Sequence, residues 1–253
     1  MCLILVAINT VPERPWLLLG NRDEFHARAT AAAAAWNDHP EIIGGRDLVA
    51  GGSWLAVNRN GRFAAVTNVR TGKQSPAPRS RGELVGGYVA GATAADAYVT
   101  DVAARRAEYG PFNLVVGDGG TTMFVSSIDG RPRRLERGVH AFSNGSLEDE
   151  WPKMRRLRRG MEAMRQSGKW DDADLLELLA DTHQPADLDL PQTGVGLALE
   201  RTLAPIFIRG EQYGTRASTL AYARADGGLT LVERSFGPAG APLGERRIET
   251  DRA

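Results

Sequence analysis

Short apolar runs separated by polar breaks open the chain. Residues 2–7 and 16–20 are two continuous apolar runs, typical of buried strands. The short link between them carries two prolines, which favours a hairpin. Residues 53–57 and 62–66 flank an Asn-Gly pair, the favoured turn of a tight hairpin. The pattern therefore predicts four strands in the first 70 residues, and residues 44–52, rich in glycine, suggest loops around a short strand.

Helical spacing of apolar residues replaces the strand pattern further along. Residues 82–109 predict two helices, with Thr93 as the cap of the second. The rest of the chain alternates between the two kinds of element. We expect strands over 112–116, 122–126, 138–142, 204–208, 218–223 and 229–233, helices over 151–166 and 171–180, and a long loop over 182–194.

In two segments, apolar residues recur at no clear spacing. Residues 31–35 are all alanine and have helical propensity. Their flanks do not continue an amphipathic helix, so the sequence predicts a loop or one short turn as readily as a helix. The tail from Gly237 is rich in glycine, proline and charge, and its last residues are expected to be mobile. The pattern alone supports one mixed α/β or α+β domain over residues 1–253.

Charge and hydropathy narrow the classes of partner. The 253 residues carry 31 Lys plus Arg and 31 Asp plus Glu, so no overall field draws the chain to nucleic acid or an anionic membrane. No stretch resembles a signal peptide or approaches the roughly 20 apolar residues of a membrane span. We therefore expect a cytoplasmic protein that acts on a small molecule. Residues 131–137 and 153–159 still hold nine Lys or Arg, either a solvated surface or a patch for an anionic ligand.

The chain has one cysteine, and it directly follows the initiator methionine. A single cysteine excludes an internal disulfide and any multi-cysteine metal site. The four histidines lie at spacings that do not suit metal ligands, so no metal or cofactor is predicted. Removal of Met1 would give Cys2 a free α-amine with a pKa near 7.7–8.0. That amine could act as the base for the thiol, as in N-terminal threonine nucleophiles, although Cys2 could also be an incidental small residue.

A charged tetrapeptide, Asn21-Arg22-Asp23-Glu24, directly follows the second apolar run. Two acids and an arginine cannot all face a core, so the segment is either a solvated strand end or part of a site. Near Cys2, the arginine would favour the thiolate and a carboxylate would orient the amine.

These features together resemble the NRDE family, the transport and Golgi organisation protein family. The shared pattern continues through Gly51-Gly52-Ser53-Trp54, Thr67-Asn68, Ser143-Asn144-Gly145 and Gly214-Thr215-Arg216. The resemblance covers nearly the whole chain. It implies the N-terminal-nucleophile hydrolase fold, an α+β four-layer αββα sandwich.

The same layout is similar to that of the choloylglycine hydrolase and penicillin V acylase families, which cleave amides. By that similarity Cys2 matches the nucleophile and Asp23 the aspartate that holds its amine. Asn68 and Asn144 match oxyanion donors, and Arg216 resembles a late site arginine.

Three further residues complete the candidate site. Those hydrolases place their arginine three residues before the aspartate, whereas Arg22 directly precedes Asp23, so the two side chains are expected on opposite faces of the strand. Arg22 stays a candidate catalytic residue. Trp54, beside Ser53, is predicted to line the substrate cavity, although a core position is the alternative.

Two functions follow. The first is an N-terminal cysteine hydrolase that cleaves an amide, ester or thioester through an acyl-enzyme. The second, implied by the resemblance, is a non-catalytic haem or acyl-lipid binding and trafficking protein that uses the same cavity, with Cys2 or a histidine on the haem iron. The full set of Asp23, Asn68, Asn144 and Arg216 beside Cys2 favours the hydrolase, because a carrier needs no paired oxyanion donors.

Overall fold

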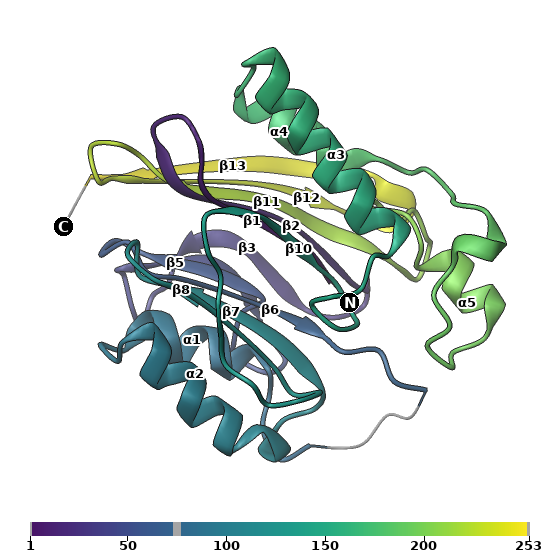
Figure 1. The fold of residues 1–253 in the computed structure, drawn as a ribbon, viewed down its shortest axis with the longest axis horizontal. Helices are drawn as coiled ribbons and strands as arrows, with labels where there is room; N and C mark the ends of the chain where they lie inside the picture. The colour runs from purple at the N-terminus through teal and green to yellow at the C-terminus, as the bar shows by residue number, and fades with distance from the viewer. Residues whose placement is uncertain (1, 73–76, 252–253) are drawn as a thin grey trace.

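The computed structural model describes residues 2–72 and 77–251, and in them two antiparallel sheets dominate (Figure 1). The first sheet runs, in spatial order, β10 (Gly138–Phe142), β1 (Cys2–Val11), β2 (Arg14–Phe25), β11 (Tyr213–Ala223), β12 (Leu229–Phe236) and β13 (Pro242–Thr250). The second runs β3 (Thr30–Ala35), β4 (Ile42–Asp47), β5 (Leu55–Asn58), β6 (Phe63–Asn68), β7 (Phe112–Gly117), β8 (Thr122–Ser126) and β9 (Arg133–Arg134).

Helices cover the outer face of each sheet. In Figure 1, α1 (Gly82–Ala90) and α2 (Ala95–Ala104) lie below the second sheet. On the far side of the first sheet lie α3 (Pro152–Ser167) and α4 (Asp172–Glu177), while α5 (Leu197–Thr202) stands near the N-terminal end of the sandwich. The order of layers is helix, sheet, sheet, helix, which confirms the four-layer αββα prediction.

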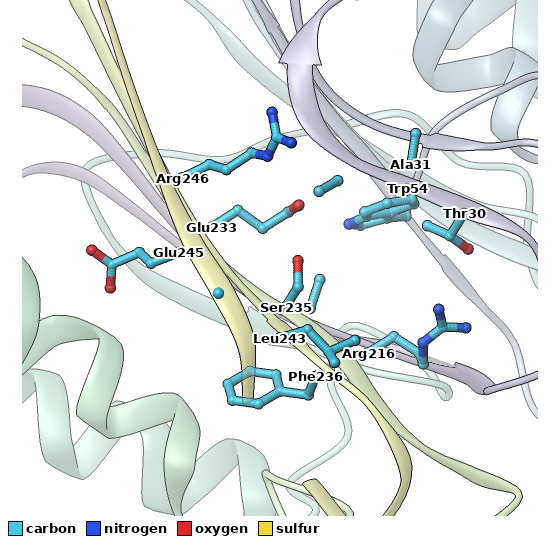
Figure 2. Close-up of a pocket in the computed structure, with 13 residues that line it drawn as sticks. Thr30, Ala31, Trp54, Arg216, Glu233, Ser235, Phe236, Leu243, Glu245 and Arg246 are labelled. Carbon is cyan, nitrogen blue, oxygen red and sulfur yellow. The ribbon is translucent and has the colours of Figure 1, made fainter. Parts of the chain in front are cut away.

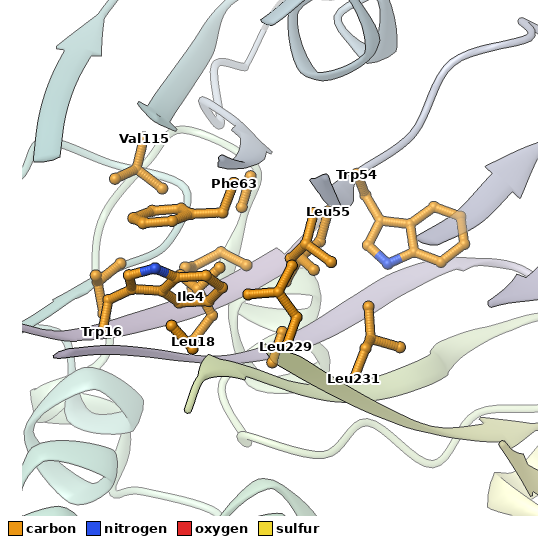
Figure 3. Close-up of a cluster of buried hydrophobic side chains, with 14 of the residues drawn as sticks. Ile4, Trp16, Leu18, Trp54, Leu55, Phe63, Val115, Leu229 and Leu231 are labelled. Carbon is orange, nitrogen blue, oxygen red and sulfur yellow. The ribbon is translucent and has the colours of Figure 1, made fainter. Parts of the chain in front are cut away.

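Three apolar cores separate these layers. The inner core lies between the sheets, where the rings of Trp16 and Phe63 have centroids 4.5 Å apart (Figure 3). In β1, Ile4 and Val6 face this inner core, while Leu3 and Leu5 face α3 and α4. Both faces of β1 are therefore buried, which explains why its sequence is a continuous apolar run rather than an alternating one.

Most predicted elements are confirmed. The two N-terminal hairpins form with the expected pairing, and the helices and strands between residues 82 and 180 lie close to their predicted places. Residues 204–208 are wrong as a strand, because they form a turn whose Ile208 amide bonds the Thr215 hydroxyl. Thr93 is also wrong as a cap, since α2 begins after Ala94 with no side-chain cap.

The two segments in which apolar residues recur at no clear spacing, residues 31–35 and the tail from Gly237, both contribute strands. Residues 31–35 belong to β3, which pairs with β4, so both a loop and a helix are wrong there. In the tail, β13 pairs with β12, and Arg247 is anchored to Asp172. Residues 252 and 253, at the end of the tail, lie outside the described residues, so the expected mobility of the last residues stays a prediction. Within the described part of the chain, no helix is long and apolar enough to cross a membrane.

Candidate active site

Cys2 is the first residue of β1, at one end of the inner layer. Its partner in the neighbouring strand is Arg22, and cross-strand partners share a face of the sheet. That face is the inner one, which Ile4 also uses two residues further along. The Cys2 side chain is 7% exposed. The thiol thus sits between the two sheets, fixed by a rigid strand.

The surroundings of the thiol act on its ionisation in opposite directions. Burial raises the pKa of Cys2, and the carboxylate of Asp23 adds to this. The guanidinium of Arg22 and a hydrogen bond from the backbone N–H of Asp23 lower the pKa. Arg81, which precedes α1 and donates to the Pro111 carbonyl at 3.1 Å, is a second cation in the field of Cys2. The two arginines partly offset the cost of a buried thiolate.

Asp23 lies beside Cys2 but on the outer side of β2. Its Oδ1 accepts a hydrogen bond from Thr215 Oγ1 at 2.8 Å, and Thr215 Oγ1 in turn accepts one from the Ile208 amide at 2.9 Å. The Tyr213 hydroxyl donates to the Asp23 carbonyl at 3.0 Å. Burial raises the pKa of Asp23, whereas Lys153 and the Thr215 hydrogen bond lower it. The network holds the carboxylate in one orientation.

Lys153 brings a positive charge to this buried acid. It comes from the first turn of α3, is 3% exposed, and donates from Nζ to the Leu203 carbonyl at 3.2 Å. Burial lowers the pKa of Lys153 to about 8, and the nearby Asp23 carboxylate limits that fall. Lys153 and Asp23 therefore support one another's charge in a site with little water.

The two asparagines meet where the sheets come together. Asn68 ends β6 and Asn144 follows β10, and Asn144 Nδ2 donates to the Asn68 carbonyl at 2.8 Å. Ser143 Oγ bonds both the Cys2 carbonyl, at 2.9 Å, and Asn144 Oδ1, at 3.1 Å. These bonds join Cys2 to both residues that resemble oxyanion donors. Asn144 has one amide hydrogen committed to Asn68 and a second that remains for another acceptor.

A buried ion pair closes this end of the site. Arg70, two residues after Asn68, pairs with Glu200 of α5, and both side chains are 4% exposed. The Arg70 guanidinium also lies over the Trp151 ring, 5.0 Å from its centroid. The pair ties α5 to the segment that follows Asn68.

Arg22 points away from Asp23, which confirms the expectation drawn from their adjacency. Its Nη1 donates to Thr30 Oγ1 at 3.1 Å, and its guanidinium lies 4.4 Å from the centroid of the Trp54 ring. Gly45 makes room for this stack, because a Cβ there would lie 2.1 Å from the Trp54 ring. Arg22 therefore stays on the inner face with Cys2, while Asp23 lies on the outer side with Lys153.

The remaining predicted residues lie apart from Cys2. Trp54 and Arg216 line a cavity between β3 and strands β11 to β13 (Figure 2). Ser53, predicted to bind substrate, is buried, and its hydroxyl bonds the carbonyls of Gly45 and Leu55 at 2.8 and 2.9 Å. These two hydrogen bonds fix the conformation of the loop that carries Ser53.

The basic segments are largely balanced by acids. Arg133, Arg156 and Arg158 pair with Asp129, Asp181 and Glu150. No group of three or more His, Cys, Asp or Glu suited to a metal occurs within residues 2–72 and 77–251.

Sequence reasoning missed Lys153, Arg81 and Tyr213. Lys153 sits in a run of exposed basic residues, so only its helical phase relative to the buried Met154 and Leu157 could have singled it out. Arg81 and Tyr213 lie in segments without a diagnostic pattern, and no local signal marks them.

The chain matches a known protein family over most of its length. The family described as Transport and Golgi organisation 2 matches residues 1–238. The mouse Transport and Golgi organization 2 homolog is 30% identical over 237 residues, which cover 87% of this chain and 86% of that protein. The Drosophila melanogaster Transport and Golgi organization protein 2 is 26% identical over 265 residues, covering 93% and 92%.

The fold also matches a solved hydrolase. The C2A mutant of the conjugated bile acid hydrolase from Clostridium perfringens aligns with a TM-score of 0.55 and 9% identity, over 99% of this chain and 92% of that one. This likeness shows the N-terminal-nucleophile hydrolase fold, with its two antiparallel sheets and flanking helices. By its sequence over nearly its whole length, the chain belongs to the Transport and Golgi organisation 2 family.

Proposed function

We propose that this protein is an N-terminal cysteine hydrolase that cleaves an amide, ester or thioester bond of a small molecule through an acyl-enzyme. The observation that carries the proposal is the joining of Cys2 to Asp23, Asn68 and Asn144 through direct hydrogen bonds or through Ser143. Burial shifts the pKa values of both Lys153 and Asp23, which lowers the stability of the folded protein. Ionisable groups with shifted pKa values cluster at functional sites. The fold shared with a bile acid hydrolase supports the same function.

The proposed reaction has two steps. After Met1 is removed, the α-amine of Cys2 takes the thiol proton as Sγ attacks the substrate carbonyl. The Asn68 and Asn144 amides donate to the oxyanion, and the protonated amine returns its proton to the leaving amine, alcohol or thiol. Water then attacks the thioester with the amine as its base. The acid leaves, and the Cys2 thiol is restored.

Each neighbour of Cys2 has a defined part in this reaction. Asp23 orients the α-amine and stabilises its protonated form. Among the described residues, none hydrogen-bonds to the Asn68 side-chain amide, so this amide is free to meet an oxyanion. Arg22 and Arg81 make the thiolate easier to form.

The test is the intact mass of the protein after incubation with p-nitrophenyl acetate. We expect a chain that lacks Met1 and gains one acetyl group, while Cys2→Ala gains none and loses turnover by a factor of about 10³ or more. A Cys2→Ser variant keeps the α-amine and the shape of the site, and should show slow acylation. Unchanged turnover in Cys2→Ala, or acylation of a chain that retains Met1, would contradict the proposal.

The carrier alternative makes a different prediction. It requires a ligand to bind without turnover and, for haem, an axial ligand from Cys2 or a histidine. A haem titration of the wild-type protein and of Cys2→Ala should then give a Soret shift that the variant loses. The hydrolase proposal expects no such shift at micromolar protein.

A further inference from the structure

The described residues form a cavity of about 290 Å³ between the edge of the second sheet and the last three strands of the first. Residues of β3 and the Trp54 ring form one side, and β11, β12 and β13 form the other. Figure 2 shows Glu233 and Arg246 pointing from the yellow strands toward Trp54, with Arg216 on the side of Thr30.

Strand pairing connects this cavity to Cys2. Cys2 pairs with Arg22, Arg22 with Ala217, Ala217 with Ser235, and Ser235 with Gly244. Partners in adjacent strands share a face, so these residues form one row across the inner side of the sheet. The last three are small and line the cavity. Since strands are about 4.8 Å apart, the floor of the cavity begins about 10 Å from Cys2.

Three arginines gather around the cavity without a carboxylate partner. Arg22 is 4% exposed and reaches the cavity wall through Thr30 and Trp54. Arg216 lines the cavity at a bulge in β11, where the pairing register shifts. Arg246 lines it from the exposed strand β13. Over residues 2–72 and 77–251, none of the three has an acid within 4 Å, because Glu24 pairs with Arg28 and Glu245 with Arg234.

Two acids line the cavity, Glu233 and Glu245, and neither neutralises these arginines through direct contact. Glu233 Oε1 accepts the Ala33 amide at 2.7 Å, and Oε2 accepts the Thr219 hydroxyl at 3.2 Å. Burial raises the pKa of Glu233, whereas its hydrogen bonds from Ala33 and Thr219 and the charges of Arg22 and Arg246 lower it. Arg216 uses Nη1 on the carbonyls of Phe25, His26 and Arg28, so its other nitrogens are available to a ligand.

We propose that this inter-sheet cavity binds the carboxylate of a small, partly apolar organic acid, held by Arg216 and Arg246. A guanidinium matches the planar, bidentate geometry of a carboxylate. Trp54, Phe236 and Leu243 supply apolar walls for the carbon skeleton, which a free inorganic anion would not use. The buried charge of Arg22, about one strand away, adds long-range attraction in a region of low dielectric.

The position of the cavity also suggests its part in the reaction. If the anion is a portion of the substrate of Cys2, the substrate carries a carboxylate about 10 Å from the bond that is cleaved. That step rests on the hydrolase function proposed above. The binding site itself does not depend on it, and a binding measurement tests it separately.

The experiment measures binding of phenylacetate and of its neutral analogue phenylacetamide, by calorimetry, to wild-type protein and to Cys2→Ala. Both proteins should bind phenylacetate, and phenylacetamide should bind at least tenfold more weakly. Arg246→Gln and Arg216→Gln should each weaken phenylacetate binding by about tenfold or more, since each removes a charge-assisted contact. Arg137→Gln is the matched control. Arg137 is exposed and does not line the cavity, so this variant should leave binding unchanged.

Defined outcomes overturn the proposal. Equal binding of phenylacetate and phenylacetamide would show that the charge is not recognised. Unchanged affinity in Arg246→Gln would do the same, and because Arg246 is exposed, we expect this variant to fold. Because acylation of Cys2 is measured on its own, binding without acylation contradicts only the hydrolase, and acylation without binding contradicts only the cavity.

Discussion

Lys153 carries a positive charge into a place with almost no water. Its pKa is lowered from the ordinary 10.5 to about 8, mainly because burial disfavours the charged form. Between these values the folded protein holds fewer protons than the unfolded chain. The cost to stability is therefore complete below pH 8 and fades as the pH rises toward 10.5. At about 1.4 kcal/mol for each pKa unit, it amounts to about 3 kcal/mol.

Replacing Lys153 with methionine removes that cost and keeps the length of the side chain. We expect Lys153→Met to raise the free energy of unfolding at pH 7 by up to about 3 kcal/mol, with most of the gain gone at pH 10.5. Acylation of Cys2 should become slower, because Asp23 loses its cation. Urea unfolding at the two pH values measures the first effect, with the exposed Lys169→Met as control. A variant less stable than wild type at pH 7 would show that Lys153 is structural.

At the scale of elements, the edge strand β13 adds a charged network to its pairing with β12. Its side chains are largely exposed, and its anchor to the helical layer is Asp172 at the start of α4. Asp172 accepts from Arg247 at 2.7 Å, from Arg14 at 2.9 Å and from the Tyr222 hydroxyl at 3.0 Å. Three partners on one carboxylate make a network, which is worth more than isolated surface pairs.

Asp172→Asn should weaken that network. We expect a loss of about 1–2 kcal/mol in the free energy of unfolding, smaller at high salt, because two charge-assisted hydrogen bonds become ordinary ones. Urea unfolding in low and high salt is the measurement. Asp189→Asn, an exposed acid with no ion pair among the described residues, is the control and should cost less than about 0.5 kcal/mol. Equal losses in the two variants would mean that β13 is held by its pairing with β12 alone.

The same edge strands explain what could and could not be predicted from the sequence. The central strands β1 and β2 are buried on both faces, so their apolar runs and the catalytic candidates beside them are visible in the sequence. β3 is almost all alanine and is an edge strand whose residues are mostly half-buried, and β13 is a charged edge strand whose side chains are mostly exposed. Neither carries the period of two that marks a strand. Since both line the cavity, the place of Arg246 in it was hidden for the same reason, whereas Arg216 and Trp54 were already candidates from the sequence.

Across the whole molecule, the candidate active site is shared between the two sheets. Cys2, Arg22 and Asp23 belong to the first sheet, while Asn68 ends β6 of the second, and Trp54, which stacks on Arg22, directly precedes β5. The distance between the two sheets depends on the inner core, where Phe63 packs against Trp16 (Figure 3). The outer core under α1, centred on residues such as Leu84, holds a helix to the second sheet and has no direct part in that separation. The two cores should therefore differ in their effect on the site.

Phe63→Ala and Leu84→Ala separate these effects, because both remove a fully buried side chain. We expect losses of about 3–5 and 2–5 kcal/mol in the free energy of unfolding, respectively. Acylation of Cys2, divided by the folded fraction from circular dichroism, should fall at least tenfold in Phe63→Ala, since the sheets shift and a displacement near 1 Å costs about 10²-fold in a positioned reaction. In Leu84→Ala the normalised rate should stay within about twofold of wild type. Equal normalised rates in both variants would mean that the first sheet alone positions the chemistry, with Asn68 and Trp54 as bystanders.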